Sequence, residues 1–447
     1  MSLQDRLNQF DSPIEMLKSP PPGIGGNGFP YPAVHTNWRD EQRAWRETAV
    51  LLDQTYHMSD LFISGPDAVR LLSDTSVNSY ANFGPARAKQ YLAVNEEGYV
   101  VGDSIVQHSP DGTINVAGLE HSLNWLQFHA EKGNYKVDFG REPASGGQSG
   151  TKRLYRYELE GPNAWKILEK AAGKKLDRIG FFRMREIEIA GNRVVALNHT
   201  MGGVPGEDST GLELFGQWEH HDGFLQAILD AGAEFGMRRG GAITYGSTAL
   251  EGGWIGAVVP AIYTSESLRS YREWLPETAL ENLGLFINGS FQPESVEDFY
   301  YTPWDLGYGH MIKFDHDFIG RDSLEKMAQG ETGRKVWLMW NIEDTERALI
   351  DGEFDRPNAP RPLVSPSTTA RDALVVGDRV VGSATFHGYT VNVGQWLSVA
   401  SVGPDVSDGD AVEIIWGDAD GGVSNPFVPE HTQRRIRTTV SFSAPAH

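Results

Sequence analysis

At roughly 150 residues per domain, a chain of 447 residues has room for two or three domains, and its 40% hydrophobic and 22% charged residues are typical of a globular protein. The 39 basic residues against 60 acidic ones give a net charge of −21, which disfavours general binding to nucleic acid or anionic membranes. The chain has no cysteine, which excludes disulfides, thiolate metal sites and cysteine nucleophiles.

The N-terminal residues carry no apolar core of the kind found in signal peptides. No window approaches the ~20 apolar residues that a membrane-spanning helix needs. We therefore expect a cytoplasmic protein.

Residues 19–32 are rich in proline and glycine and predict an extended lead-in. The word "GIGGNG" within it follows no strand and opens no helix, which disfavours a nucleotide-binding loop. Residues 38–49 have helical spacing, and residues 86–108 predict a hairpin that turns at "NEEG". A helix is also expected to end at Gly236.

Two segments have the same predicted order of strand, Gly-Pro turn and helix, namely "DLFISGPDAVRLLSDTS" and "LYRYELEGPNAWKILEKAAG". This likeness indicates a weak internal duplication of an α+β unit. From about Arg334 onward the sequence changes to short β-type runs broken by glycine, proline and aspartate, which predicts an all-β module of about 110 residues. We place the domain boundary between residues 330 and 331.

The stretch "LGYGHMIKFDHDFIGRDSL" raises the question of a metal site, because Asp315, His316 and Asp317 are adjacent. In a strand the two carboxylates would point away from the imidazole, so only a turn could gather all three. The alternative is structural, with Asp317 or Arg321 framing the start of a helix. The "EHH" word at residues 219–221 lacks the spacing of a zinc motif, and neither "GxSxG" nor a dinucleotide-binding fingerprint is present.

Six separated words resemble, in family order, the aminomethyltransferase (T-protein) of the glycine cleavage system and its tetrahydrofolate-dependent relatives: "LLDQTYHMSDLFISGPDA", "KQYLAVNEEGYVVGDSIV", "GGVPGEDSTGLEL", "GSTALEGGW", "LGYGHMIKFDHDFIGRDSL" and "VGSATFHGYTVNVGQWLSVASVG". The resemblance implies an α+β, three-domain, cloverleaf-like aminomethyltransferase fold with a C-terminal all-β domain. Residues 1–330 would form a folate-binding region of two intertwined α+β domains, and residues 331–447 a β-barrel-like domain. It also makes "DFIGRDSL" a helix-start marker, so we expect no metal ligand there.

Within that superfamily the chain looks closest to bacterial aryl O-demethylases of the vanillate, syringate and dicamba type, through the words "NWRDEQRAWR", "NWLQFHA", "LEGGWI" and "PAIYTSESLRSYREWLP". The resemblance implies transfer of a methyl group from a methoxybenzoate to tetrahydrofolate, giving a phenol and 5-methyltetrahydrofolate. The partners would be a small aromatic methyl ether and tetrahydrofolate, with no nucleic acid or membrane. The alternatives are an aminomethyltransferase, an aliphatic methyl-donor demethylase, or a non-catalytic folate-binding protein.

The resemblance assigns three residues to the reacting substrate. A phenolate leaves poorly unless a proton or hydrogen bond meets its oxygen, so a general acid is required. His57 in "DQTYHM" and Tyr245 in "ITYGSTALEGGW" match active-site positions of the family, and Tyr31 matches a substrate-contacting tyrosine. Without the family context, each would be an ordinary structural histidine, core tyrosine or turn tyrosine.

Three further residues match folate-contacting positions of the family. Glu213 in "GLEL" would accept hydrogen bonds from pterin N–H groups, and Trp254 would stack on the pterin ring. Asp103 in "VVGDSIV" would lie near the folate nitrogens. The structural alternatives are a packed core tryptophan and a turn aspartate.

The chain departs from the vanillate-type pattern at two places. Leu119 stands where those enzymes carry an arginine that pairs with the substrate carboxylate. We therefore expect either that another donor such as His121 binds the carboxylate, or that the ring binds in a different orientation with a more hydrophobic edge, which would suit a less polar, chlorinated methoxybenzoate. The extra residues "EDST" before "GLEL" are expected to change the shape of the entrance to the folate-binding site.

Overall fold

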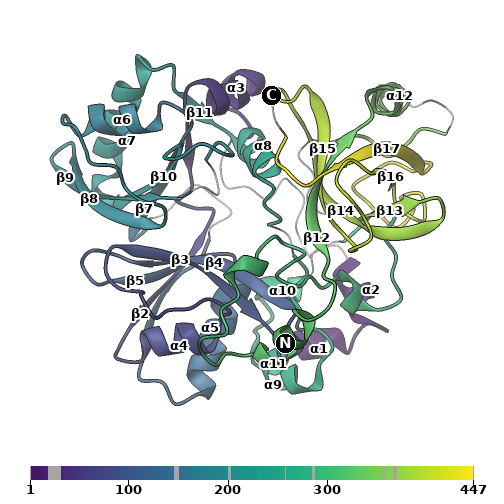
Figure 1. The fold of residues 1–447 in the computed structure, drawn as a ribbon, viewed down its shortest axis with the longest axis horizontal. Helices are drawn as coiled ribbons and strands as arrows, with labels where there is room; N and C mark the ends of the chain where they lie inside the picture. The colour runs from purple at the N-terminus through teal and green to yellow at the C-terminus, as the bar shows by residue number, and fades with distance from the viewer. Residues whose placement is uncertain are drawn as a thin grey trace. The chain divides into compact units, whose positions relative to one another are not determined.

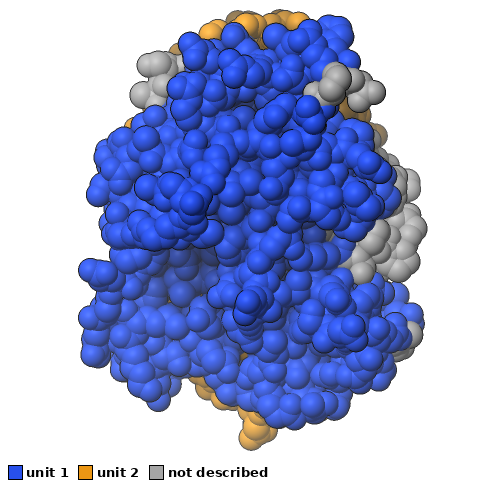
Figure 2. Space-filling model, turned by 90° about the vertical axis from the view of Figure 1, so that its right-hand side faces the viewer, with its two compact units in different colours: residues 1–25, 94–102, 253–447 blue, residues 26–93, 103–252 orange. Residues whose placement is uncertain are grey.

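The computed structural model describes residues 2–18, 32–144, 151–199, 203–256, 258–283, 287–354, 356, 358–365 and 370–445. The chain divides into two compact units, coloured separately in Figure 2. Unit 1 comprises residues 1–25, 94–102 and 253–447, and unit 2 comprises residues 26–93 and 103–252. The boundary between residues 330 and 331 stays a prediction.

Eleven strands of the described chain form one sheet, which belongs to unit 2 except around the turn from β3 to β4. Across the sheet they run β11 (Arg238–Gly240), β1 (Val50–Asp53), β7 (Leu154–Glu160), β10 (Gly211–Gln217), β9 (Asn192–Asn198), β8 (Arg183–Ile189), β3 (Arg87–Val94), β4 (Val100–His108), β5 (Ile114–Gly118), β2 (Ser59–Ser64) and β6 (Asp138–Glu142). The predicted hairpin between β3 and β4 is confirmed, because the Asn95 N–H donates to the Tyr99 carbonyl at 2.8 Å.

The sheet repeats one topology, which confirms the predicted duplication. From the central pair β3–β8 outward, the strands run β3-β4-β5-β2 in one half and β8-β9-β10-β7 in the other. The first strand of each half, β2 or β7, leads through a Gly-Pro turn into a helix, which is α4 (Ala68–Asp74) or α6 (Ala164–Ala171). The turn glycines Gly65 and Gly161 have φ of 112° and 114°, a region that L side chains rarely adopt.

The two faces of the second half of the sheet differ in chemistry. One face is apolar and packs against α6 and α7 (His221–Ala233) through buried residues that include Tyr157, Leu159 and Leu214 (Figure 1). The opposite face carries Arg156, Glu158 and Glu160 from alternate positions of β7. Its register places Glu213 of β10 directly beside Glu158. This second face carries Glu213, and Tyr245 packs against it through Val50 and Leu52 of β1.

Other helical segments of unit 2 complete its framework. They are α3 (Trp38–Glu47), α5 (Glu120–Lys132), the 3₁₀ turn η1 (Trp218–His220) and α8 (Ala242–Gly252). The predicted helix that ends near Gly236 is confirmed as α7. The helix ends at Ala233, and Gly236 follows it with φ of 71°. The "EHH" word supplies the last two residues of η1 and the first residue of α7.

A closed six-stranded barrel in unit 1 accounts for the predicted C-terminal β-type runs. Its strands, in order around the barrel, are β12 (Arg334–Trp340), β15 (Gln395–Val402), β14 (Arg379–Thr390), β13 (Asp372–Val376), β16 (Ala411–Trp416) and β17 (Arg434–Ser441). Alternate residues of β12, namely Val336, Leu338 and Trp340, fill its core, so Lys335 and Trp337 lie on the outer face.

The module is not purely β, because α12 (Ile342–Glu353) follows β12 directly. The helix begins where the Asn341 side chain accepts a hydrogen bond from the Asp344 N–H at 3.1 Å. Ile342, Leu349 and Ile350 remain exposed on it. The sequence around Asn341 lacks the broad apolar stripe of a buried helix, which explains why the pattern did not predict one.

Unit 1 also holds short helices before and between these elements. They are α1 (Leu3–Leu7), α2 (Pro13–Lys18), η2 (Glu266–Leu268), α9 (Arg269–Trp274), α10 (Leu280–Leu283), η3 (Val296–Phe299), η4 (Gly309–Met311) and α11 (Arg321–Met327). Across the described ranges, no helix combines the length and apolar character needed to span a bilayer.

The "DFIGRDSL" stretch starts α11, as the family resemblance implies. Gly320 enters the helix with φ of 84°, and a Cβ there would lie 2.3 Å from the Asn95 carbonyl oxygen. The Arg321 guanidinium donates to the His316 carbonyl at 3.1 Å and to the Asp317 carboxylate at 2.7 Å. Within the described ranges, no three metal-ligating side chains converge, here or elsewhere.

Candidate active site

The two predicted catalytic residues lie in contact within unit 2. His57 is in the loop between β1 and β2, and Tyr245 is in the first turn of α8. Their rings meet edge to face, with centroids 5.2 Å apart and planes at 77°. Tyr245 is 8% exposed and packs in a cluster with Trp45, Val50 and Leu52. Residues 188 positions apart in the sequence are thus brought together on one face of the sheet.

A buried carboxylate fixes the start of α8 and therefore the position of Tyr245. Glu41 on α3 accepts hydrogen bonds from the Gly241 N–H at 2.9 Å, from the Thr244 hydroxyl at 3.1 Å and from the His35 N–H at 2.8 Å. Burial alone would raise the pKa of Glu41, but these donors lower it overall, so the group stays ionised. The sequence analysis did not identify Glu41.

The environment of His57 determines its protonation. Burial lowers the pKa of His57 from 6.5 to about 4, because an imidazolium would lose its hydration there. At neutral pH the ring is uncharged, so it can donate or accept a hydrogen bond but does not hold an acidic proton. Of the two candidates for the proton donor, this favours Tyr245.

A buried polar network joins the two halves of the sheet around Glu213. Arg156 on β7 lies between two carboxylates: its guanidinium donates to Asp60 on β2 at 2.8 Å and also to Glu213 Oε1. Gln107 on β4 donates to the same Glu213 oxygen at 2.8 Å, and His199 Nε2 lies 3.2 Å from Glu213 Oε2. Asp60, Arg156 and Glu213 are each at most 5% exposed.

The network has more acidic than basic groups. One guanidinium faces two carboxylates, while burial, and secondarily the Arg156 charge, lowers the pKa of His199 to about 4 and leaves it neutral. A neutral histidine beside Glu213 does not balance the second carboxylate. The pterin of the implied tetrahydrofolate offers several N–H donors, so its chemistry fits this acidic network. Glu213 Oε1 already accepts from Arg156 and Gln107, so Oε2 is the oxygen better placed for a pterin.

Two further acidic residues lie on the same face of β7, and they add less negative charge to it than two ionised carboxylates would. Burial raises the pKa of both Glu158 and Glu160, and the two side chains share a hydrogen bond. The pair therefore retains a proton near neutral pH. Trp45 provides a further hydrogen bond to Glu160. These acids are compatible with a buried face because they are not both ionised.

Asp103 lies on β4 and is half-buried. Its carboxylate accepts a hydrogen bond from Gln90 Nε2 at 2.6 Å. It points to the same face as Gln107, which is four residues further along the strand. Asp103 therefore belongs to the sheet face that carries the Glu213 network, as a folate contact would require, and its role stays a prediction.

The predicted carboxylate-binding positions lie at the start of α5. Leu119 is the half-buried residue before the helix, and its carbonyl accepts from the Ser122 hydroxyl at 3.2 Å. His121, in the first turn, is 3% exposed. Arg141 on β6 reaches this region, but its guanidinium already binds Glu120 and donates to Asn124 at 2.7 Å. Leu119 thus supplies no charge for a substrate carboxylate.

Two predicted residues cannot be joined to this cluster. Trp254 belongs to unit 1, where its ring packs over Gly256, and its indole N–H has no hydrogen-bond partner among the described residues. Tyr31 lies outside the described residues, as does the "GIGGNG" word. The roles of Trp254 and Tyr31 stay predictions.

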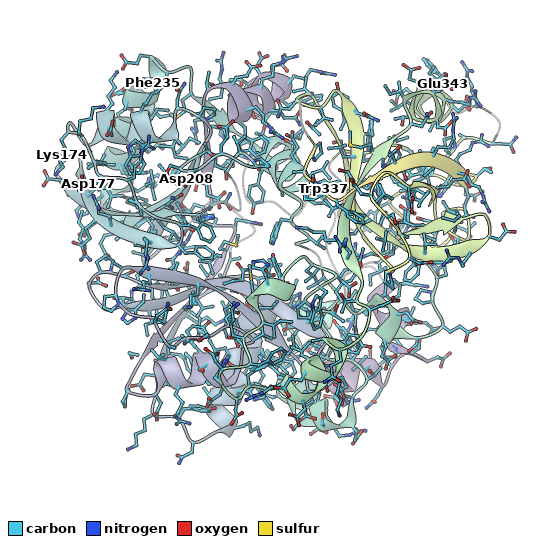
Figure 3. The ribbon with its side chains drawn as sticks, in the orientation of Figure 1. Lys174, Asp177, Asp208, Phe235, Trp337 and Glu343 are labelled. Carbon is cyan, nitrogen blue, oxygen red and sulfur yellow. The ribbon has the colours of Figure 1, made fainter. Side chains whose placement is uncertain are left out.

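The extra "EDST" residues form a compact turn before β10. Thr210 Oγ1 accepts from the Val204 N–H at 2.9 Å and donates to the Glu207 carbonyl at 3.0 Å. Asp208, labelled in Figure 3, is exposed on this turn. The insertion directly precedes the strand that carries Glu213.

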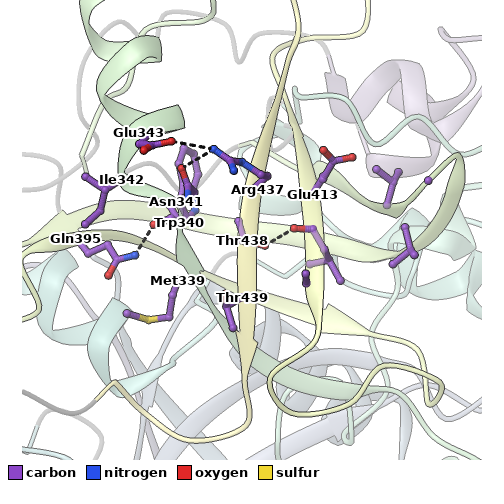
Figure 4. Close-up of a pocket in the computed structure, with 15 residues that line it drawn as sticks. Met339, Trp340, Asn341, Ile342, Glu343, Gln395, Glu413, Arg437, Thr438 and Thr439 are labelled. Carbon is purple, nitrogen blue, oxygen red and sulfur yellow. Dashed lines mark hydrogen bonds and ion pairs between the residues drawn. The ribbon is translucent and has the colours of Figure 1, made fainter.

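A pocket of about 820 Å³ opens beside the barrel and α12 (Figure 4). It contains none of the predicted site residues. Its cation, Arg437, is already paired with Asp344 at 2.8 Å and with Glu343 at 3.5 Å. We therefore do not assign the active site to this pocket.

Comparisons with known proteins identify the family of the chain. A profile of the GCVT N-terminal domain family matches residues 8–258. The chain is 38% identical to syringate O-demethylase from Sphingobium sp. (strain NBRC 103272 / SYK-6) over 446 residues, covering 98% of this chain and 95% of that protein. It is 25% identical to sesamin methylene transferase from Sinomonas sp. (strain No.22) over 428 residues, covering 92% of this chain and 89% of that protein.

The fold is that of a solved relative. The glycine cleavage system aminomethyltransferase T from Bartonella henselae matches with a TM-score of 0.58 at 14% identity, covering 90% of this chain and 88% of that chain. The predicted α+β class with a C-terminal barrel is confirmed. The family match over more than half of the chain, together with a nearly full-length relative at 38% identity, shows that the chain belongs to the GCVT family.

Proposed function

We propose that this protein is a tetrahydrofolate-dependent O-demethylase that converts a methoxybenzoate and tetrahydrofolate into the corresponding phenol and 5-methyltetrahydrofolate. The observation that carries the proposal is the nearly full-length similarity to a syringate O-demethylase. The contact between Tyr245 and His57 adds a chemical reason, because an aryl ether needs a hydrogen-bond donor at its leaving oxygen.

In this mechanism Tyr245 donates a hydrogen bond to the ether oxygen and a proton to the departing phenolate, and the proton that methylation displaces from tetrahydrofolate would restore the Tyr245 hydroxyl. His57 stays neutral and holds the phenol ring of Tyr245 by edge contact. Glu41 fixes the first turn of α8, which keeps the Tyr245 hydroxyl in one place. Such positioning supplies much of the rate, because it replaces a random encounter with an oriented one.

The acidic network binds the cofactor. Tetrahydrofolate, when bound, supplies the N5 atom that accepts the methyl group. Glu213 would hold pterin N–H groups, while Arg156 and Gln107 orient its carboxylate. Asp103 would lie near the folate nitrogens. The same network excludes water from the sheet face, since its members are buried.

The identity of the ring is a finer proposal. Because Leu119 supplies no cation, we favour a less polar methoxybenzoate, such as a chlorinated one of the dicamba type, over vanillate. Turnover of vanillate at a rate comparable to that of dicamba would remove the basis for this preference.

The test is anaerobic incubation with tetrahydrofolate and each of vanillate, syringate, 2-methoxybenzoate and dicamba. Equal amounts of a phenol and 5-methyltetrahydrofolate from one substrate are expected. Folate binding without any product would favour an aliphatic methyl donor, aminomethyl transfer or a binding role instead.

A further inference from the structure

An ammonium group on the outer face of the barrel has an unusual environment. Lys335, the second residue of β12, is half-buried, and its Nζ lies 5.3 Å from the ring centroid of Trp337. The backbone of Gly307 closes over the end of the side chain. A Cβ at Gly307 would lie 3.1 Å from Lys335 Cε and 3.3 Å from Nζ. The ammonium is thus held in place by a tryptophan ring and a glycine turn.

This cation has no anionic partner within the described part of the chain. Among those residues, the Lys335 side chain makes no hydrogen bond or ion pair, and its one polar contact is with the Trp337 ring. The carboxylate of Asp305 binds Ser401, the cross-strand partner of Lys335, and also accepts from Thr302. Asp305 is therefore already engaged by two hydroxyl groups.

Burial without a partner is costly for an ammonium. It lowers the pKa of Lys335 to about 8, so the group is still mostly protonated at neutral pH. A surface lysine can turn toward water, but this side chain is confined by Gly307 and Trp337. An incoming anion would recover the interaction that the described residues do not supply.

The surroundings of Lys335 connect it to a predicted cofactor residue. The Trp337 ring, labelled in Figure 3, packs on the backbone of Gly253, where a Cβ would lie 2.1 Å from Trp337 Cζ2. Gly253 directly precedes Trp254, whose indole N–H also lacks a partner among the described residues. One region of unit 1 thus combines a confined cation, an indole N–H that no described residue accepts and two indole rings.

We propose that Lys335, backed by Trp337, forms a carboxylate-binding subsite of this enzyme. The proposal rests on the proposed function, which brings two carboxylates to the protein. One is the glutamate tail of tetrahydrofolate, and the other is the carboxylate of the methoxybenzoate, for which Leu119 supplies no cation. Both would form a charge-assisted hydrogen bond with the ammonium.

The experiment compares Lys335→Gln with wild type and with Lys326→Gln, which removes an equal charge from an exposed position on α11 of the same unit. Lys335→Met, which keeps the length of the side chain without its charge, is the second variant should Lys335→Gln fold poorly. Dissociation constants and KM values are measured for tetrahydrofolate, for tetrahydropteroate, which lacks the glutamate, for a methoxybenzoate and for its uncharged methoxyphenol analogue.

Loss of the ammonium is expected to weaken one carboxylate-bearing ligand by roughly tenfold or more. If the tail is the source, the variant weakens tetrahydrofolate binding and leaves tetrahydropteroate unchanged. If the substrate is the source, it weakens the methoxybenzoate and leaves the methoxyphenol unchanged. Lys326→Gln should match wild type throughout.

The proposal is overturned if Lys335→Gln and Lys335→Met match Lys326→Gln for all four ligands, since Lys335 would then only cover Trp337. It is also overturned if each member of a pair weakens equally, because the loss would not depend on a carboxylate. If the wild-type protein forms no product, the proposed function fails, and the dissociation constants still decide the subsite.

Discussion

Tyr245 and His57 meet edge to face on the polar side of the sheet, with ring centroids 5.2 Å apart. One partner comes from a loop after β1 and the other from the first turn of α8. Because burial keeps His57 neutral, Tyr245 is the better proton donor of the two.

Replacing Tyr245 with phenylalanine should remove the hydrogen bond to the leaving oxygen while preserving the ring contact. We expect kcat to fall by roughly 100-fold or more, with little change in the dissociation constant of tetrahydrofolate. Steady-state kinetics and equilibrium binding measure the two quantities. Tyr155→Phe, on the apolar face of the same sheet, is the matched control. A loss of folate binding in Tyr245→Phe would reassign this residue to the cofactor.

The pH dependence of the rate tests the state of His57. A pKa of about 4 means that the ring does not change charge between pH 8 and pH 5.5. We therefore expect any fall in kcat over this range to be the same in the wild type and in His57→Asn. A change in kcat with a midpoint near pH 6.5 that is present in the wild type and absent from His57→Asn would show that protonated His57 takes part.

Arg156 should be essential for stability because it separates two buried carboxylates. Arg156→Met leaves Asp60 and Glu213 without their cation, and we expect a loss on the order of 3 to 5 kcal/mol in the free energy of unfolding. Urea denaturation measures the loss. Adding Asp60→Asn and Glu213→Gln to the same variant should restore part of it. Equal destabilisation in the single and triple variants would contradict this account.

His199 links stability to pH. Its pKa is about 4 in the folded protein, against 6.5 in an unfolded chain, so the unfolded state binds more protons between these values. The free energy of unfolding should therefore fall as the pH drops from about 6.5 to about 4, by on the order of 3 kcal/mol from this residue.

The measurement is urea denaturation of the wild type, His199→Gln and the exposed-site control His310→Gln at pH 7 and pH 4.5. The pH sensitivity should shrink in His199→Gln only. The same loss of stability in all three proteins would show that His199 is not its source.

Local signals in the sequence were sufficient for many elements of the fold. The two Gly-Pro words predicted the duplicated turns because Gly65 and Gly161 need a backbone conformation that few residues adopt. The β-type runs predicted the barrel strands. Helix α12 was missed because Asn341 begins it without a buried apolar stripe behind it.

The site was predicted less completely. The family resemblance named Tyr245 and His57, which the structure brings into contact, and Glu213, which it places in a buried network. Arg156 was missed because "YRYELE" alternates polar and apolar residues, a pattern typical of a strand with one face in water. Here the polar face is buried, and only long-range pairing with Asp60 and Glu213 reveals it.

The most direct test of the central claim is a product assay with purified protein under anaerobic conditions. With tetrahydrofolate and the methoxybenzoate panel, the account predicts one phenol and 5-methyltetrahydrofolate in equal amounts, and a loss of both products in Tyr245→Phe. Formation of neither product from any substrate, with tetrahydrofolate bound, would contradict it.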